Sequence, residues 1–187
     1  MKKILIVVDM QNDFITGSLG SPEAQAIIPK VKEHLRSLDE KDYVIFTMDT
    51  HFDNYLESGT MESKKLPVKH TIKGSDGWLI FEDLTSLSPG PQTLALKQTF
   101  CSWDFDSVIT EEVLCSYVKN GGNPEEDLEF EIFGVCTDIC VISIALYLRS
   151  FYPNVKITCL KDLCAGSSPA AHEAALTVMK SCMIDIV

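Results

Sequence analysis

Hydrophobic and polar positions change their spacing along the chain in a regular way. Six short apolar runs, each bounded by turn residues, predict buried strands. These strands lie at Lys3–Asp9, Tyr43–Asp49, Thr93–Lys97, Asp127–Val135, Val155–Leu160 and Met183–Val187. Segments with helically spaced hydrophobic residues predict helices at Pro22–Ser37, Ser107–Lys119, Ile139–Phe151 and Pro169–Ser181. Strands that alternate with helices in this way predict an α/β fold built on a mostly parallel sheet.

The stretch from Thr50 to Gln92 breaks this alternation. It is long and charged, and it is punctuated by Gly59, Pro67, Gly74, Gly77, Pro89, Gly90 and Pro91. Loops of this length within a compact domain are usually functional. We therefore expect the stretch to contribute residues to a site.

Composition and charge fit one globular domain over residues 1–187. Hydrophobic residues make up 45% of the 187 residues, which is enough for a sizeable core. The formal net charge of −11 argues against a nucleic-acid backbone or an anionic membrane as the main partner. The net charge does not exclude small-molecule substrates.

The start of the chain has the basic and apolar character of a signal peptide. Asp9 and the polar residues that follow end the apolar run early, so we interpret it as a first buried strand. No apolar stretch of the sequence is long enough to span a bilayer. Seven cysteines, an odd number spread through the chain, favour free thiols in a reducing cytoplasm over a disulfide framework.

Chemically active residues follow the carboxyl ends of four predicted strands. The first strand ends at Asp9 and the second at Asp49, with His51 just beyond it. The third ends at Lys97, and the fourth leads to Cys140. In an open parallel sheet these ends meet at one edge, where ligands bind. The polarity of turns could account for the two aspartates, but it does not account for a lysine and a cysteine at equivalent places.

Cys140 lies in the first turn of a predicted helix, behind a Thr137–Asp138 pair that we expect to cap it. The positive end of the helix dipole favours a thiolate there, so we expect a lowered pKa and a nucleophilic sulfur. Lys97 would lower that pKa further, and Asp9 could take the thiol proton and donate it to a leaving amine. The alternatives are a buried structural cysteine, a solvated lysine and an aspartate in a turn.

Asp49 and His51 are two residues apart, so in an extended chain both side chains point the same way. They could hold one divalent metal, with a second imidazole from His70 in the long loop. Three protein ligands leave positions open for water or substrate, which favours a catalytic ion. Glu62 and Glu57 are further candidate ligands. Two other histidines lie on predicted helices, and we interpret them as surface residues: His34 and His172.

Several segments together resemble the isochorismatase-like cysteine hydrolases, and among these the nicotinamidases most. The resemblance runs nearly from end to end of the chain. It rests on Asp9-Met10-Gln11-Asn12-Asp13-Phe14, Asp49-Thr50-His51, Pro67-Val68-Lys69-His70, Gly74-Ser75-Asp76-Gly77, Lys97, and Gly134-Val135-Cys136-Thr137-Asp138-Ile139-Cys140-Val141. Together these segments are highly specific, whereas the first or the last alone is only moderately so.

For the fold, the resemblance implies three α/β/α layers around a six-stranded, mostly parallel sheet. For catalysis, it implies that Cys140 is the nucleophile and that Lys97 and Asp9 are its partners. It also implies a cis peptide bond between Val135 and Cys136. The N–H groups of Cys136 and Cys140 would then form an oxyanion hole.

For the metal, the resemblance implies one divalent ion held by Asp49, His51 and His70. We expect zinc first, with iron or manganese as alternatives. In nicotinamidases the metal binds the substrate's ring nitrogen, so it would orient the substrate as much as activate water. The implied reaction is hydrolysis of a small carboxamide to an acid and ammonia through a thioester on Cys140. We also expect a homo-oligomer.

The residues expected around the substrate depart from the nicotinamidase pattern. Those enzymes usually carry an aromatic residue just before the proline ahead of the last metal histidine, where this chain has Leu66. His70 also sits one residue further from that proline. Phe14 and Trp103 could still form an aromatic wall, or they could simply pack in the core. We therefore keep carbamoyl-amide hydrolysis as an alternative, whereas the three metal ligands argue against isochorismatase itself.

Two hypotheses lie outside hydrolysis. The first is a metal-storage or redox protein that uses four cysteines: Cys136, Cys140, Cys159 and Cys164. Their spacing does not repeat the paired spacing of common zinc sites, and Cys159 falls within a predicted buried strand. The second is a catalytically silent binding domain with an aromatic-rich helix end that meets partners: Tyr147, Leu148, Phe151 and Tyr152. An intact Asp9, Lys97 and Cys140 set argues against it.

Overall fold

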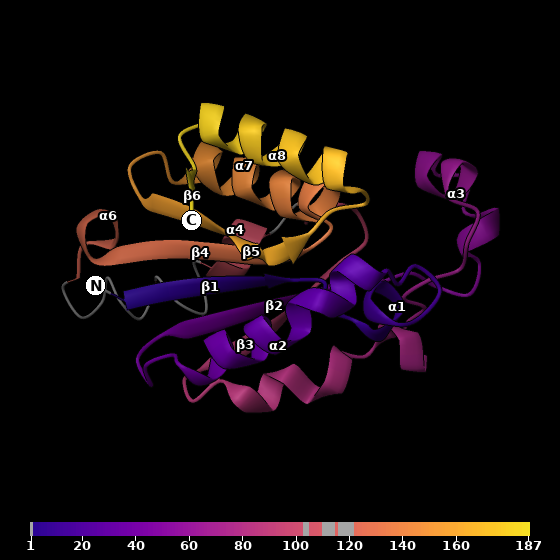
Figure 1. Cartoon of the computed structure of the whole chain (residues 1–187), viewed down its shortest axis with the longest axis horizontal. Coiled ribbons are helices and arrows are strands. Elements are labelled where there is room, and N and C mark those ends of the chain that lie inside the picture. Colours follow the sequence, from indigo (N-terminus) through magenta and orange to yellow (C-terminus); the bar gives the residue numbers. More distant parts are fainter. Residues whose placement is uncertain (1, 103–104, 110–114, 116–121) are drawn as a thin grey trace.

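A single parallel sheet organises the computed structural model, which describes residues 2–102, 105–109, 115 and 122–187 (Figure 1). Its six strands lie in the order β3-β2-β1-β4-β5-β6, and every pairing is parallel. The strands are β1 (Lys2–Val8), β2 (Tyr43–Asp49), β3 (Gln92–Lys97), β4 (Leu128–Val135), β5 (Lys156–Ala165) and β6 (Asp185–Ile186). The expected six-stranded parallel sheet is confirmed.

Helices cover both faces of the sheet, and the longest are α2 (Pro22–Arg36), α7 (Ile142–Phe151) and α8 (Pro169–Ser181). Phe133 of β4 packs edge-on against His34 of α2, with 5.5 Å between ring centres. Phe130 of the same strand contacts Tyr152, just beyond α7. Because these two positions of a strand point to opposite faces, α2 and α7 lie on opposite sides of the sheet. The three-layer arrangement is therefore confirmed.

The core follows from this layering. Ile4 to Val8 of the central strand β1 are fully buried, and all seven residues of β2 are buried as well. Strands covered on both faces are expected to be continuously apolar rather than alternating. The continuous apolar runs in the sequence therefore predicted the central strands correctly.

The two strands nearest the chain end differ from their predicted bounds. β5 does not stop at Leu160 but continues to Ala165, because the exposed Lys161 and Asp162 bulge out of the sheet and pairing then resumes. β6 is shorter than expected, since only Asp185 and Ile186 pair with β5. The charged residues thus mark a bulge and not the end of the strand.

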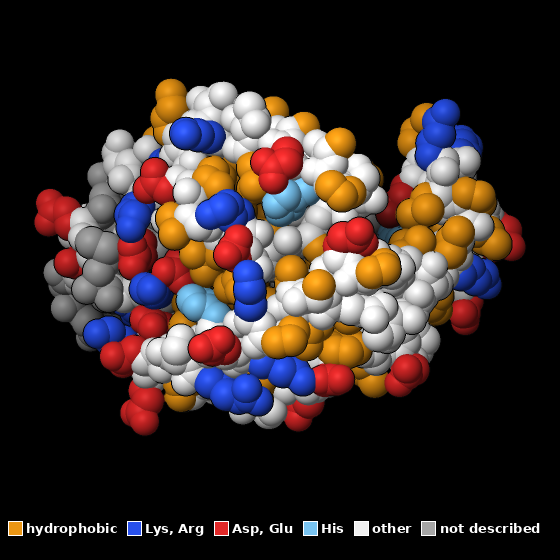
Figure 2. Space-filling model, viewed as in Figure 1, with side chains coloured by type: hydrophobic (Ala, Val, Ile, Leu, Met, Phe, Trp, Pro, Cys, Tyr) orange, Lys and Arg blue, Asp and Glu red, His pale blue; other side chains and the backbone are white. Residues whose placement is uncertain are grey.

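Short helices make up much of the rest. They are α1 (Asn12–Ile15), α3 (Met61–Lys65), α4 (Phe105–Ile109), α6 (Pro124–Asp127), and 3-10 turns at Tyr55–Glu57, Asp76–Trp78 and Phe81–Leu87. Of the predicted helix at Ser107–Lys119, the part beyond α4 lies outside the described residues, apart from Cys115. The α3 segment projects from the body, and the space-filling view shows a notch beside it (Figures 1 and 2).

On the face drawn in Figure 2, acidic and basic side chains are interspersed and do not form a basic stripe. None of the helices among the described residues is long and apolar enough to cross a bilayer.

Glycine at position 134 lets β4 pass close to β1 where the site begins. Gly134 has a φ of +129°, and a Cβ atom there would lie 2.1 Å from the Val8 carbonyl oxygen. The next peptide bond, Val135–Cys136, is cis, as the family resemblance implied. The approach of the two strands therefore requires a residue without a side chain.

Gly134→Ala should lower the free energy of unfolding by at least about 2 kcal/mol, because both the backbone angle and the clash with Val8 oppose it. Urea denaturation would measure the loss. Gly59→Ala is the matched control, since Gly59 also has a positive φ of 71° but nothing lies within 4 Å of its added Cβ. That variant should lose only about 1 kcal/mol. Equal losses would contradict the close-approach argument.

Candidate active site

The parallel sheet brings the predicted residues together at its carboxyl edge. Asp9 follows β1, whereas Asp49 and Lys97 are the last residues of β2 and β3. Cys140 lies in the turn that follows β4. All four side chains are buried. The prediction that strand ends converge on one site is confirmed.

Lys97 stands at the centre of this group. Its side chain is almost fully buried, at 3% exposure. The Nζ atom lies 2.7 Å from Asp9 Oδ2, 3.5 Å from Asp49 Oδ1 and 3.4 Å from the Cys140 sulfur. It also donates to the Thr99 carbonyl at 3.2 Å. Burial lowers the pKa of Lys97, but the charges around it, Asp9 foremost, raise it above its ordinary value and keep the ammonium charged.

Asp9 is fully buried and adopts a left-handed backbone with a φ of +50°. Its Oδ1 atom accepts a hydrogen bond from the Thr47 hydroxyl at 2.7 Å, while its Oδ2 atom faces Lys97. Burial raises the pKa of Asp9, and the Lys97 charge opposes that rise. A carboxyl whose pKa is raised can both accept and return a proton near neutral pH.

A single turn of π-helix, Thr137–Val141, carries Cys140 and leads directly into α7. The expected capping by Thr137 and Asp138 is wrong, because neither side chain caps the turn. Asp138 accepts from the Ser167 N–H at 2.7 Å and from its hydroxyl at 2.5 Å. Thr137 pairs with His172 Nδ1 at 2.8 Å. Both residues tie the turn to the segment after β5.

The resting state of Cys140 also differs from the sequence prediction. Burial raises the pKa of the Cys140 thiol well above its ordinary value, the Asp9 carboxylate raises it further, and Lys97 opposes the rise without cancelling it. The helix end and the lysine were expected to give a thiolate. Burial outweighs them, with the nearby carboxylates adding to its effect, so the site favours the thiol over the thiolate.

Asp49, His51 and His70 form a compact group of metal-type ligands. One ligand atom from each lies within 4.8 Å of the others, and all three residues are buried. Asp49 Oδ2 lies 3.1 Å from His51 Nε2 and 3.5 Å from His70 Nε2. Glu62 Oε1 lies 3.5 Å and 3.7 Å from the same two nitrogens. Oxygen and imidazole atoms that converge in this way fit a divalent ion.

Two observations on the histidines support that fit. His70 Nδ1 lies 2.8 Å from the Val68 carbonyl, which orients its other nitrogen toward Asp49. His51 Nε2 is buried and has no aligned hydrogen-bond partner, although it lies close to two carboxylates. Burial lowers the pKa of His51, but Asp49 and Glu62 raise it to about 9. The negative charges of Asp49 and Glu62, which favour a proton on His51, also favour a metal cation beside it.

Both carboxylates in this group stay ionised. Burial raises the pKa of Asp49, but His51 and Lys97 hold it at about 2. Burial also raises the pKa of Glu62, and the two histidines hold it at about 2. Glu57, the other candidate ligand, is exposed on its 3-10 turn. Of the two glutamates, Glu62 therefore faces the histidines.

Residues between the strands hold the metal-type group in place. The Gln11 side chain accepts a hydrogen bond from the Asp49 N–H at 2.8 Å and donates one to the Asp49 carbonyl at 2.9 Å. Asp13 accepts from the Thr71 N–H at 2.7 Å, and the Thr71 hydroxyl donates to Asp49 Oδ2 at 2.8 Å. The polar run after β1 thus fixes both Asp49 and the loop that carries His70.

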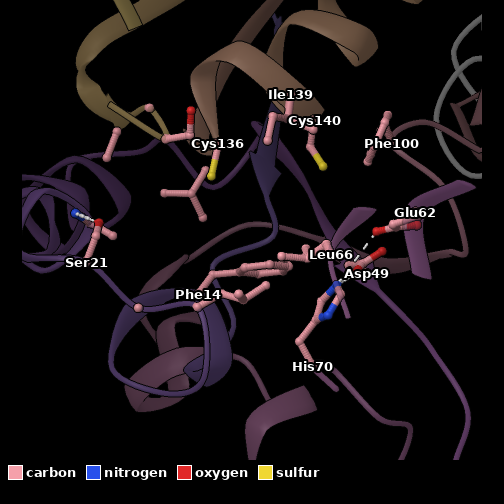
Figure 3. A pocket seen from close by; sticks show the side chains of 17 residues that line it. Phe14, Ser21, Asp49, Glu62, Leu66, His70, Phe100, Cys136, Ile139 and Cys140 are labelled. Atoms are coloured by element: carbon pink, nitrogen blue, oxygen red, sulfur yellow. Dashed lines mark hydrogen bonds and ion pairs between the residues drawn. The ribbon is translucent and has the colours of Figure 1, made fainter. Parts of the chain in front are cut away.

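A cavity of about 360 Å³ lies beside these groups, and the Cys140 side chain points into it (Figure 3). Phe14 and Leu66 line it, as the sequence predicted, and Phe14 packs edge-on against His70. Phe100 also lines it. Phe100 was not predicted from the sequence, although its place three residues beyond Lys97 was a usable signal. Trp103 lies outside the described residues.

The remaining predictions from the sequence concern two histidines and four cysteines. His34 and His172 are half-buried and not on the surface, because His34 faces Glu131 at 3.2 Å and His172 meets Thr137. The four-cysteine metal site does not form, since the one metal-type group among the described residues contains no cysteine. Cys159 and Cys164 do approach each other, with 3.8 Å between their sulfurs.

Fold and site together define a hydrolytic enzyme of the α/β class, with a buried thiol at the carboxyl edge of a parallel sheet. The chain belongs to the isochorismatase family, because the isochorismatase domain matches residues 3–187.

Characterised and uncharacterised relatives match over nearly the whole chain. An uncharacterised isochorismatase family protein of Bacillus subtilis, PncA, is 26% identical over 192 residues, covering 95% of this chain and 93% of the relative. The nicotinamidase/pyrazinamidase of Mycobacterium tuberculosis is 26% identical over 195 residues, covering 99% and 98%. A pyrazinamidase of Pyrococcus horikoshii, solved in complex with zinc, superposes with a TM-score of 0.75 and is 29% identical, covering 100% of this chain and 99% of that chain.

Lys97→Met should lower the free energy of unfolding by about 3–5 kcal/mol, because it leaves the buried Asp9 carboxylate without its cation. Urea denaturation would measure this loss. Lys30→Met is the control: Lys30 pairs with Asp162 on the surface, with side chains 59% and 68% exposed. Its loss should stay below about 1 kcal/mol. A loss for Lys97→Met as small as the control's would show that the buried charge is not needed for the fold.

Glu62→Gln should weaken binding of a divalent metal by about 10- to 100-fold, because Glu62 adds negative charge beside both histidines. Chelator competition, with metal content measured by mass spectrometry, would give the affinities. Glu57→Gln removes the same charge from an exposed position and should leave the affinity unchanged. His70→Gln should abolish stoichiometric metal. Full metal retention by His70→Gln would rule out this ligand set.

Proposed function

We propose that this protein is a metal-dependent cysteine amidohydrolase that converts a small carboxamide of the nicotinamide type to the acid and ammonia. The observation that carries the proposal is Lys97, which lies 2.7 Å from Asp9 and 3.4 Å from Cys140. The Cys140 side chain and the ligand group around Asp49 line the same cavity. Relatives named as nicotinamidase and pyrazinamidase support the amide as substrate.

The first half of the reaction transfers the acyl group to sulfur. Asp9 accepts the proton of the Cys140 thiol as the sulfur attacks the amide carbon and forms the C–S bond. Asp9 then gives that proton to the amide nitrogen, and the C–N bond breaks to release ammonia. The raised pKa of the thiol supports proton transfer during the attack, rather than a thiolate formed beforehand. The Lys97 charge opposes the rise in the pKa of Asp9 and orients its Oδ2 atom.

The second half reverses these roles. Asp9 takes a proton from a water molecule that attacks the thioester carbonyl. The C–S bond breaks, the acid leaves, and Asp9 returns the proton to the Cys140 sulfur. We propose the N–H groups of Cys136 and Cys140 as the oxyanion donors in both halves, because both residues line the cavity.

We propose zinc as the ion, held by Asp49, His51 and His70 with Glu62 beside them. The buried Nε2 atom of His51 without an aligned hydrogen bond and the oriented His70 support this donor set. When bound, zinc would supply a Lewis acid for a ring nitrogen of the substrate and for water. Phe14 and Leu66 would then hold the ring, and Trp103 is a further candidate for that wall.

Other features of the protein remain proposals of the same kind. We propose that residues 1–187 act as one domain, that the protein works in the cytoplasm, and that it forms a homo-oligomer. The free cysteines among the described residues support a reducing compartment.

Ammonia release by purified, metal-analysed protein from nicotinamide and pyrazinamide tests the proposal. Wild type should release ammonia, and Cys140→Ala should lower the rate to background, because no other group replaces the thiol. Cys136→Ala is the matched control, and it should keep most of the activity because only its backbone is proposed to act. Normal turnover by Cys140→Ala would refute the nucleophile. Turnover of carbamoyl amides alone would keep the mechanism and change the substrate.

A further inference from the structure

The cavity extends beyond the thiol and the metal-type ligands, because residues from two further segments also line it. At about 360 Å³ it falls in the range of roughly 300–1,000 Å³ that is typical of pockets for drug-sized ligands. Figure 3 places Ser21 across the cavity from Asp49, Glu62 and His70, with the Cys136 and Cys140 sulfurs between them. A ring held between Cys140 and the metal-type ligands therefore occupies only one side.

We call the other side the far limb. It is lined by residues from the start of α2 and its preceding loop and from the end of β5: Leu19, Ser21, Ala24, Ala165, Gly166 and Ser167. Both hydroxyls are already engaged, since Ser21 Oγ accepts from the Ala24 N–H at 3.0 Å and Ser167 Oγ donates to Asp138. None of the described residues in this limb carries a charge.

The contrast between the two sides decides what the far limb can hold. Asp49, Glu62 and His70 make the metal side charged, so a Lewis-basic atom belongs there. The far limb offers apolar side chains and no charged side chain, so a charged group placed in it would find no partner of opposite charge. An uncharged, apolar group would instead bury hydrophobic surface against Leu19 and Ala24.

The buried position of Asp9 decides which part of the substrate carries that group. Asp9 is fully buried and does not line the cavity, and Lys97 lies against its Oδ2 atom. The amide nitrogen must reach Asp9 to leave with a proton, so it can carry little bulk. An additional group must therefore be attached to the acyl part of the substrate.

We propose that the preferred substrates are primary carboxamides whose acyl part carries a Lewis-basic atom at one end and an uncharged apolar substituent at the other. This inference rests on the proposed function, which it narrows to a substrate class. The basic atom faces the metal-type ligands, the amide carbon faces Cys140, and the substituent fills the far limb. Nicotinamide itself leaves that limb unfilled.

Ammonia release from nicotinamide and from its 4-propyl and 5-propyl derivatives by the metal-loaded enzyme tests this preference. At least one propyl derivative should have a kcat/KM at least about tenfold above nicotinamide, because its alkyl group is buried on binding. If nicotinamide is turned over and both derivatives are about tenfold worse, the far limb does not receive substrate and the inference fails.

Variants at Leu19 test whether the propyl group binds in the far limb. Leu19→Trp fills the limb and should cancel the advantage of the propyl group, so that the kcat/KM ratio of the propyl derivative to nicotinamide falls to about one. Leu19→Ala should favour a bulkier derivative, such as a phenyl-substituted one. Leu79→Trp is the matched control, because Leu79 is 48% exposed and does not line the cavity. Equal losses for nicotinamide and the propyl derivative in Leu19→Trp would overturn the assignment.

Binding measurements distinguish a failure of this inference from a failure of the proposed function. Cys140→Ala protein can be titrated with nicotinate and with propyl-nicotinates by calorimetry, independently of turnover. Tighter binding of a propyl acid, lost in the Leu19→Trp background, would support the far limb even if wild type released no ammonia from any of the amides. In that case the amidase proposal alone would fail. Equal binding of all the acids would refute the far limb.

Discussion

The buried positive charge of Lys97 is the constraint on which the site depends. A lysine at 3% exposure is tolerated only when anionic partners compensate for its lost hydration. Asp9 at 2.7 Å and Asp49 at 3.5 Å provide that compensation. One charge therefore joins the carboxyl ends of β1, β2 and β3. Its contact of 3.4 Å with Cys140 adds the turn after β4 to the same group.

Asp49 extends this constraint to the metal-type ligands. Its Oδ1 atom faces Lys97, whereas its Oδ2 atom faces His51 and His70. The thiol side and the cation side of the cavity thus share one carboxylate. Because Gln11 holds the Asp49 backbone through two hydrogen bonds, the polar run after β1 supports both sides at once. The arrangement explains why a long loop can deliver His70 to a rigid position.

The local chemistry around Cys140 was the part of the site that the sequence predicted least well. Thr137 and Asp138 look like capping residues, yet their partners are His172 and Ser167, which follow about 30 residues later. The thiol of Cys140 looks activated by a helix end, yet burial beside Asp9 raises its pKa. In both cases a long-range contact outweighs a local preference. Neither contact leaves a periodic signal in the sequence.

The α/β class, the six strands and the residues at their carboxyl ends could all be predicted from the sequence, because apolar periodicity and parallel strand geometry depend on local spacing. The sequence also singled out Asp49, His51 and His70. Packing of the folded chain makes Glu62 and not Glu57 face the histidines, brings Phe100 to the cavity wall, and raises the pKa of the Cys140 thiol. Those outcomes depend on burial and on contacts between distant segments, which exist only once the chain has packed.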